Sequence, residues 1–294
     1  MKCLITGANG FLGKKISKIF LNERNEVFCT VKGGKNSGNS LDITDKKNVF
    51  RIFEKKMPDV VIHTAAATNV DWCETHRKET FKINVEGTKN ISLACKIIGA
   101  KLVYISTDYV FDGTKNGKYN EEDKTNPKNV YAESKLEGEL TLQKELEDYI
   151  ISRVTVLYGY NDRFDKKCFP MRVIEALSAK KEFFCFVDQY SNPTLINDIS
   201  KAILSLVKKN QKGLFHMTGS ENLNRLEFAK KTAKIFGLDE SLLLESSWEK
   251  SGFLAKRQPK LNISIKKLEN CGIQMSDASK GLLQMKKDME NIKL

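Results

Sequence analysis

Over residues 2–160, short apolar runs rich in β-branched residues alternate with longer amphipathic stretches. The apolar runs predict strands at Lys2–Thr6, Glu26–Val31, Asp59–His63, Lys101–Ser106 and Tyr149–Val156. The helical spacing of apolar residues between them predicts helices over 11–22, 45–56, 79–98 and 130–147. Strand alternating with helix indicates right-handed βαβ units, so we expect an α/β fold with a doubly wound parallel sheet of the Rossmann type.

Beyond residue 156 the alternation becomes less regular. The pattern predicts helices at 166–179, 196–209 and 224–236, strands at Phe183–Val187 and Gly213–Met217, and a helical tail. We expect 196–217 to rejoin the sheet, so that residues 1–156 and 194–217 form one domain. Residues 157–193 and 218–294 are then expected to form a smaller C-terminal lobe with the last helices. That lobe would lie over the carboxyl ends of the strands, where open α/β sheets bind ligands.

A glycine-rich turn, Gly7-Ala-Asn-Gly10-Phe-Leu-Gly13, follows the first predicted strand and opens the first predicted helix. Glycine at these positions allows a tight turn and a close approach of backbone N–H groups to a phosphate. The alternative is a turn in which glycine merely relieves steric crowding. Its place at the first strand of a βαβ series favours binding of a dinucleotide pyrophosphate, so residues 1–156 and 194–217 are predicted to bind NAD(P).

The second predicted strand ends in Thr30-Val31-Lys32, with Lys35 nearby, where a chain that binds NAD usually has an acidic residue. This favours NADPH, with NADH possible, although Lys32 and Lys35 could equally be surface charges. Asp42-Ile43 could meet the adenine, or Asp42 could simply start the next helix. After the strand that ends at His63, the small residues Ala65, Ala66, Ala67 and Thr68 would let a cofactor pass close to the backbone.

Tyr131 and Lys135 are one helical turn apart in the predicted helix 130–147, so their side chains share one face. There a lysine ammonium can lower the pKa of the phenol and bind a nicotinamide ribose, while the tyrosine donates a proton to a carbonyl oxygen. A hydroxyl of Thr107 or Ser106, at a strand end, would bind the same oxygen. Alone, Tyr-x-x-x-Lys usually marks a solvated helix face; after a glycine turn it indicates hydride transfer to or from a carbonyl.

These residues resemble the extended short-chain dehydrogenases/reductases of the dTDP-4-dehydrorhamnose reductase type, often called the sugar-nucleotide-binding family. The likeness runs nearly end to end, and its most specific segment is Ser106-Thr-Asp-Tyr-Val-Phe-Asp-Gly113. It implies NAD(P)H-dependent reduction of a 4-keto group on a nucleotide-linked deoxysugar. It also implies that Thr107 binds the carbonyl oxygen and that Asp108 lies beside it at the substrate. The residues implied to line the cofactor are Gly10, Phe11, Leu12, Asp42, Ile43, Ala66, Ala67 and Thr68.

Two positions refine this resemblance. Asp108 is followed by Tyr109, whereas related 4,6-dehydratases carry an Asp-Glu pair, because eliminating water needs both an acid and a base. This favours reduction over dehydration. Many reductases of this type have a tryptophan at the substrate where this chain has Val156. Losing that aromatic ring removes stacking worth roughly 0.5–1.5 kcal/mol, so the sugar, the nucleotide or both could differ from dTDP-rhamnose chemistry.

Other interpretations remain open at this stage. The regulatory β subunit of methionine adenosyltransferase resembles the same family and binds NADP while serving a partner enzyme. A sugar-nucleotide epimerase is a weaker alternative, because the segment that starts at Ser106 has the reductase form. Arg257 could hold a substrate pyrophosphate through its bidentate guanidinium, or fix its own loop by a salt bridge. Asn84 could join a proton-relay water or face the surface.

Charge and cysteine content limit the possible partners. The net charge of +12 comes from scattered lysines without an aromatic-interleaved basic stripe, which favours a solvated surface over nucleic-acid binding. Seven cysteines without a C-x-x-C pair indicate a reducing, cytoplasmic setting and suggest no metal site. No stretch approaches the ~20 apolar residues of a membrane span. We therefore expect a soluble cytoplasmic protein that binds neither nucleic acid nor membranes, with a homodimer possible.

Overall fold

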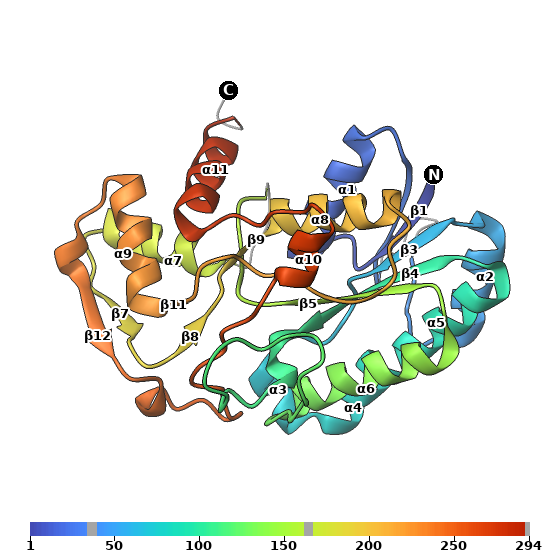
Figure 1. Cartoon of the computed structure of the whole chain (residues 1–294), viewed down its shortest axis with the longest axis horizontal. Coiled ribbons are helices and arrows are strands. Elements are labelled where there is room, and N and C mark those ends of the chain that lie inside the picture. The colour runs from blue at the N-terminus through green and yellow to red at the C-terminus, as the bar shows by residue number, and fades with distance from the viewer. Residues whose placement is uncertain (34–39, 162–166, 292–294) are drawn as a thin grey trace.

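A parallel six-stranded sheet organises the chain (Figure 1). The computed structural model describes residues 1–33, 40–161 and 167–291, so Lys35 lies outside the described residues. The strand order is β10-β5-β4-β3-β1-β2, and all five pairings are parallel. The strands are β1 (Lys2–Thr6), β2 (Glu26–Thr30), β3 (Val60–His63), β4 (Lys101–Thr107), β5 (Tyr149–Val154) and β10 (Gly213–His216). The predicted doubly wound α/β sheet is confirmed, including the return of 196–217 to its edge.

Helices cover both faces of this sheet. The helices α1 (Phe11–Asn22) and α8 (Ile196–Lys208) pack on one face, and α2 (Lys46–Lys56), α5 (Gly87–Ile98) and α6 (Val130–Glu145) pack on the other. Side chains alternate along β1, so that Cys3 and Ile5 enter the first core and Leu4 enters the second. Burial on both faces explains why the strands are continuous apolar runs in the sequence.

Several element boundaries differ from the prediction. Strand β5 ends at Val154 rather than Val156, because Val156 has a φ of +37°, which a β-branched residue rarely adopts. The helix expected over 79–98 consists of α4 (Arg77–Phe81), a π-helical turn η1 (Lys82–Glu86) and α5. A short helix that the pattern did not predict, α3 (Val70–Thr75), is capped by Asn69, whose side chain accepts from the Trp72 N–H at 3.1 Å.

The remaining elements form a smaller lobe beside the sheet, at the left of Figure 1. It contains three two-stranded ladders, β6 (Leu157–Tyr158) with β9 (Thr194–Leu195), β7 (Phe183–Phe186) with β12 (Leu243–Ser246), and β8 (Tyr190–Ser191) with β11 (Leu223–Asn224). Its other elements are α7 (Phe169–Ser178), α9 (Arg225–Phe236), η3 (Glu240–Leu242), η4 (Trp248–Lys250) and α11 (Ala278–Glu290). Helix α10 (Lys266–Asn270) instead packs against β10 at the edge of the large sheet. The domain limits expected from the sequence remain a prediction.

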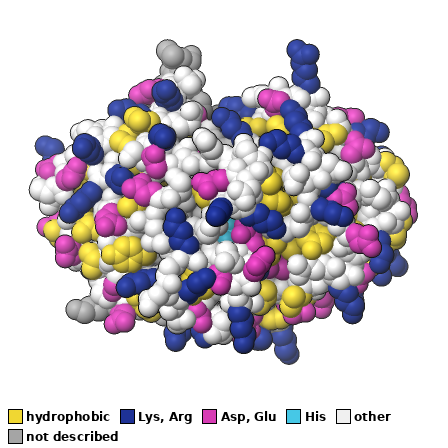
Figure 2. Space-filling model, viewed as in Figure 1, with side chains coloured by type: hydrophobic (Ala, Val, Ile, Leu, Met, Phe, Trp, Pro, Cys, Tyr) yellow, Lys and Arg dark blue, Asp and Glu magenta, His cyan; other side chains and the backbone are white. Residues whose placement is uncertain are grey.

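The surface carries mixed charge on the face shown in Figure 2, where lysine and arginine side chains are interspersed with aspartate and glutamate. A patch of a single sign, which would point to a polyanionic partner, is not seen on that face. Among the described residues, no helix combines the length and apolar character needed to cross a bilayer.

Candidate active site

A cavity of about 970 Å³ lies at the carboxyl ends of the central strands and extends to the smaller lobe. All the site residues predicted from the sequence line it. They are Gly7, Gly10, Phe11, Leu12, Gly13, Lys32, Asp42, Ile43, Ala65, Ala66, Ala67, Thr68, Ser106, Thr107, Asp108, Tyr131, Lys135, Val156 and Arg257. The fold thus brings together segments from both halves of the chain, and their individual roles are inferred below from their contacts.

The glycine turn forms the part of this cavity that could hold a pyrophosphate. Gly7 has a φ of +66°, and a Cβ there would lie 2.8 Å from the backbone of Ala65. A Cβ on Gly13 would clash with the Gly7 carbonyl oxygen. Helix α1 starts directly after Gly10, which has no side chain to cap it, and the first N–H groups of a helix lack intrahelical partners. This cradle fits the phosphates of a dinucleotide.

Replacing Gly13 by alanine is expected to weaken NADPH binding by at least about tenfold. The added Cβ would force the turn away from the Gly7 carbonyl, and overpacking of this kind costs about 1–3 kcal/mol. Titration calorimetry with NADPH measures the effect. The control is Gly99→Ala, because nothing crowds the Cβ position of Gly99, whose φ is +70°. That control should lower stability without changing NADPH affinity; equal affinities for both variants would contradict the pyrophosphate assignment.

Lys32 and Asp42 lie at the other end of the cofactor segment and pair with each other. The Lys32 Nζ is 3.0 Å from the Asp42 Oδ2, and the lysine side chain is 69% exposed. Asp42 Oδ1 also accepts hydrogen bonds from the N–H and hydroxyl of Thr44. Helix α2 is capped instead by Asp45, which accepts from the Asn48 N–H, so the suggestion that Asp42 starts that helix is wrong.

Asn84 holds the alanine segment against helix α6. Its Oδ1 accepts from the Ala67 N–H at 2.8 Å, and its Nδ2 donates to the Ala67 carbonyl at 3.0 Å and to the Ser134 hydroxyl at 2.9 Å. The side chain is buried, so the suggestion that Asn84 faces the surface is wrong. The π-helical turn η1 therefore fixes Ala67 relative to the helix that carries Tyr131 and Lys135.

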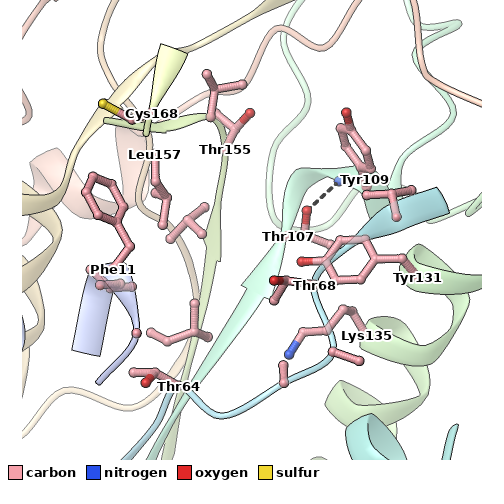
Figure 3. Close-up of a pocket in the computed structure, with 18 of the residues that line it drawn as sticks. Phe11, Thr64, Thr68, Thr107, Tyr109, Tyr131, Lys135, Thr155, Leu157 and Cys168 are labelled. Carbon is pink, nitrogen blue, oxygen red and sulfur yellow. Dashed lines mark hydrogen bonds between the residues drawn. The ribbon is translucent and has the colours of Figure 1, made fainter. Parts of the chain in front are cut away.

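Thr107, Tyr131 and Lys135 meet on one side of the cavity (Figure 3). Strand β4 ends at Thr107, whose Oγ1 accepts from the Tyr109 N–H at 3.2 Å, the bond drawn in Figure 3. The Tyr131 phenol points into the cavity near the Thr107 hydroxyl. Lys135 is buried, and its Nζ lies 3.9 Å from the centre of the Tyr104 ring. This arrangement can hold a carbonyl oxygen between a hydroxyl and a phenol.

Ser106 borders the same cavity, but its hydroxyl has another partner. It donates to Glu139 Oε1, and the same carboxylate forms two hydrogen bonds with Arg153, at 2.9 and 2.6 Å. Of the two hydroxyls proposed to bind the carbonyl oxygen, Thr107 is therefore the one that faces the cavity. The buried ion pair of Glu139 and Arg153 therefore contacts the end of β4 through the Ser106 hydroxyl.

Burial is the largest influence on the pKa values of Tyr131 and Lys135. It raises the pKa of Tyr131 above its usual value, while the Thr107 hydroxyl opposes the shift. Burial also lowers the pKa of Lys135 from 10.5 to about 7, against an opposing contribution from Glu139. Tyr131 is therefore protonated at neutral pH, which is the form that can donate a proton.

The buried Lys135 predicts a pH-dependent stability difference. The pKa of Lys135 is about 7 in the folded protein and 10.5 in the unfolded chain. Between these two pH values the unfolded chain therefore binds one more proton than the folded protein, so the free energy of unfolding rises with pH. Lys135→Met removes this contribution, so the variant should be more stable than the wild type at pH 6.5, with the gap closing by pH 9.5. The expected change in the gap is on the order of a few kcal/mol.

Denaturant unfolding at both pH values measures this gap. Lys144→Met is the control, because Lys144 is exposed near the end of the same helix. The Lys144 variant should keep a constant difference from the wild type. If the stability difference between Lys135→Met and the wild type is also the same at both pH values, burial does not destabilise the Lys135 ammonium.

Three arginines line the part of the cavity that the smaller lobe contributes. Arg257 Nη2 is 2.9 Å from Asp71 Oδ2, and its Nη1 donates to the Ala255 carbonyl, as in the loop-fixing alternative. Sequence reasoning missed Arg172 and Arg225, which lie over the rings of Phe183 and Phe169, respectively. Neither forms an ion pair with any carboxylate in the described part of the chain. Arginine is scarce in this lysine-rich chain, and that scarcity could have drawn attention to both residues.

The chain has a doubly wound parallel sheet with a glycine turn at its first strand, and its cavity brings together Thr107, Tyr131 and Lys135. These features define an extended short-chain dehydrogenase/reductase. More narrowly, the chain belongs to the RmlD substrate binding domain family, whose model matches residues 1–291. The resemblance inferred from the sequence is thereby confirmed.

Solved structures and curated relatives agree with this membership. A dTDP-4-dehydrorhamnose reductase from Clostridium acetobutylicum is 32% identical with a TM-score of 0.90, and the match covers 100% of both chains. The Bacillus anthracis dTDP-4-dehydrorhamnose reductase in complex with NADP is 31% identical with a TM-score of 0.90, covering 98% of this chain and 99% of that one. Methionine adenosyltransferase 2 subunit beta from Bos taurus is 31% identical over 278 residues, covering 92% of this chain and 83% of that protein.

Proposed function

We propose that the protein reduces a 4-keto group on a nucleotide-linked deoxysugar with NADPH. The observation that carries this proposal is the meeting of Thr107, Tyr131 and Lys135 in the cavity that the glycine turn also lines. The match to a reductase solved with NADP and the absence of an acidic residue at the end of β2 support NADPH over NADH.

The chain's own residues provide binding and proton transfer. A bound nicotinamide would supply the hydride. The Thr107 hydroxyl donates a hydrogen bond to the substrate carbonyl oxygen, and Tyr131 gives that oxygen its proton as negative charge develops there. Lys135, in its ammonium form, binds the cofactor ribose and stabilises the phenolate that Tyr131 leaves behind.

The nucleotide part of the proposed substrate is inferred from the lobe. Arg172 and Arg225 present guanidinium groups to the cavity, and such groups bind phosphates in a bidentate manner. Because Arg257 is engaged by Asp71, we assign the substrate pyrophosphate to these two arginines instead. Aromatic side chains for stacking on a base are also present at Phe184, Phe186 and Phe253.

Loss of NADPH absorbance in the presence of 4-keto-6-deoxy sugars linked to dTDP, UDP, GDP or CDP tests the proposal. We expect turnover with at least one of these nucleotides. The assay should be run with excess purified protein, so that slow turnover is detected. NADPH binding without consumption of any substrate in the panel would count against a reductase.

A regulatory subunit is the second candidate, favoured by the similarity to the methionine adenosyltransferase subunit. Under this alternative the protein binds NADP and a partner enzyme, and the cavity performs no chemistry. Co-purification with a stoichiometric partner, combined with NADP binding and no turnover, would favour it over the reductase.

A further inference from the structure

Thr6 and His63 end two neighbouring strands of the sheet, directly before the two segments predicted to hold the cofactor. They are partners in the parallel register of β1 and β3, and both are 1% exposed. Thr6 Oγ1 lies 2.7 Å from His63 Nδ1, and it also accepts from the Ala65 N–H at 3.3 Å. Ala65 lines the cavity. The histidine is therefore connected to the cavity wall through a single hydroxyl.

The other ring nitrogen of His63 faces helix α5 and the π-helical turn η1. His63 Nε2 lies 3.2 Å from Thr88 Oγ1, and the Thr88 hydroxyl donates to the Asn84 carbonyl oxygen at 2.6 Å. The Asn84 side chain in turn binds both backbone groups of Ala67. These contacts form a closed path, called the histidine circuit below, that runs through Ala65, Thr6, His63, Thr88, Asn84 and Ala67.

The directions of these bonds fix where the imidazole carries its proton. A carbonyl oxygen can only accept, so the one hydroxyl proton of Thr88 goes to Asn84. His63 Nε2 must then donate to Thr88 Oγ1, and Nδ1 accepts from the Thr6 hydroxyl. Burial, aided by the charge of Lys135, lowers the pKa of His63 from 6.5 to about 3. The ring is therefore neutral at physiological pH, with its proton on Nε2.

The histidine circuit also reaches the helix that carries Tyr131 and Lys135. Asn84 Nδ2 donates to the Ser134 hydroxyl in α6 at 2.9 Å. The contact is close, because a Cβ on Gly138 of the same helix would lie 3.1 Å from the Asn84 carbonyl oxygen. Turns of π-helix often occur at functional sites. One set of buried hydrogen bonds thus connects the cofactor wall to the helix of the proposed proton donor.

We propose that His63, with its proton on Nε2, is a positioning residue that holds Ala65–Ala67 in place for the cofactor and in line with α6. It acts through its neighbours, because the alanine segment lines the cavity and the histidine, in the described part of the chain, does not. The inference rests on the proposed cofactor binding but not on the identity of the sugar. Since a closed path is broken by the loss of any member, losing two members should cost little more than losing one.

Titration calorimetry with NADPH and steady-state turnover, both on the full chain, test this inference. Thr88→Val keeps the side-chain shape but removes the hydroxyl, so NADPH affinity should fall about 10-fold and kcat about 10- to 100-fold. Thr88→Ser returns the hydroxyl and should restore both values. His63→Leu should lose as much affinity as Thr88→Val. The double variant should lie within about twofold of the weaker single variant.

His216→Leu is the matched control. His216 is also a fully buried histidine at the end of a strand, β10, but its Nδ1 lies 3.2 Å from the Ser264 carbonyl oxygen in another part of the fold. This variant should lower the Tm as His63→Leu does and leave NADPH affinity unchanged.

Several results would overturn the inference. They are wild-type affinity in Thr88→Val, no recovery in Thr88→Ser, losses for His63 and Thr88 that add in full, or an equal loss of affinity in His216→Leu. If His63→Leu fails to fold, the two Thr88 variants decide alone. NADPH binding that depends on the histidine circuit, without turnover of any sugar, would sink the reductase but leave the role of His63 standing.

The position of the imidazole proton can be measured separately. Nitrogen-15 spectra of the histidine side chains should show His63 as a neutral ring with its proton on Nε2 at neutral pH. A proton on Nδ1, or a charged ring, would contradict the bond directions on which the histidine circuit depends.

Discussion

Replacing Tyr131 by phenylalanine should lower kcat about 10²- to 10⁴-fold, because the variant has no proton to give the carbonyl oxygen. The phenol is protonated at neutral pH and faces the cavity beside Thr107, so it is placed to make this transfer. The substitution removes one oxygen and keeps the ring that packs edge-on against Tyr109. NADPH affinity and Tm should therefore change little.

Steady-state kinetics and NADPH titration on the same preparation separate these effects. Tyr149→Phe is the control, since Tyr149 begins β5 at the end of the sheet away from the cavity. That variant should retain full turnover. A Tyr131→Phe protein that turns over within a few-fold of the control would exclude Tyr131 as the proton donor.

Replacing Glu139 by alanine should destabilise the fold by about 3–5 kcal/mol, because the Arg153 guanidinium would be left buried and unpaired. Glu139 Oε2 and Arg153 Nη2 are 2.6 Å apart, and both side chains are almost wholly buried. The Ser106 hydroxyl would lose its acceptor as well. Denaturant unfolding should show a lower midpoint with an unchanged slope.

Two further variants isolate the origin of this loss. Glu23 forms an exposed ion pair with Lys208 at a similar distance, 2.7 Å, and Glu23→Ala should have little effect because solvent screens such pairs. Glu139→Met combined with Arg153→Met should recover much of the stability, since it leaves no buried charge behind. A loss for Glu139→Ala no larger than that for Glu23→Ala would show that the buried pair is not structurally important.

The sheet and the cofactor turn could be predicted because their signals are local. The strands are continuous apolar runs because both faces of the sheet are buried. The turn after β1 leaves no room for a Cβ at Gly7 and Gly13, so its glycines are visible in the sequence. The strand pattern alone could not choose between Thr107 and Ser106, because neighbouring residues of a strand face opposite sides and the pattern does not fix which side is the cavity; the family resemblance indicated Thr107. In the structure, the Ser106 hydroxyl donates to Glu139, which agrees with that choice.

Other features depend on contacts between distant segments. Arg225 reaches the cavity through the packing of the lobe, and Asp71 engages Arg257 across more than half the chain. The early end of β5 could not be predicted either, because the positive φ of Val156 contradicts the preference of a β-branched residue. Strain at such a position is often retained at functional sites, and Val156 lines the cavity.

Transfer of deuterium from NADPH that carries deuterium at both hydrogen positions of the nicotinamide C4 to a 4-keto-6-deoxy sugar nucleotide tests the central claim most directly. Mass spectrometry of the product should show one deuterium at the former carbonyl carbon with the wild type, and none above background with Tyr131→Phe over the same time. Product without deuterium, or NADPH that stays intact with every nucleotide sugar in the panel while the protein binds it, would contradict the assignment of this site to hydride transfer.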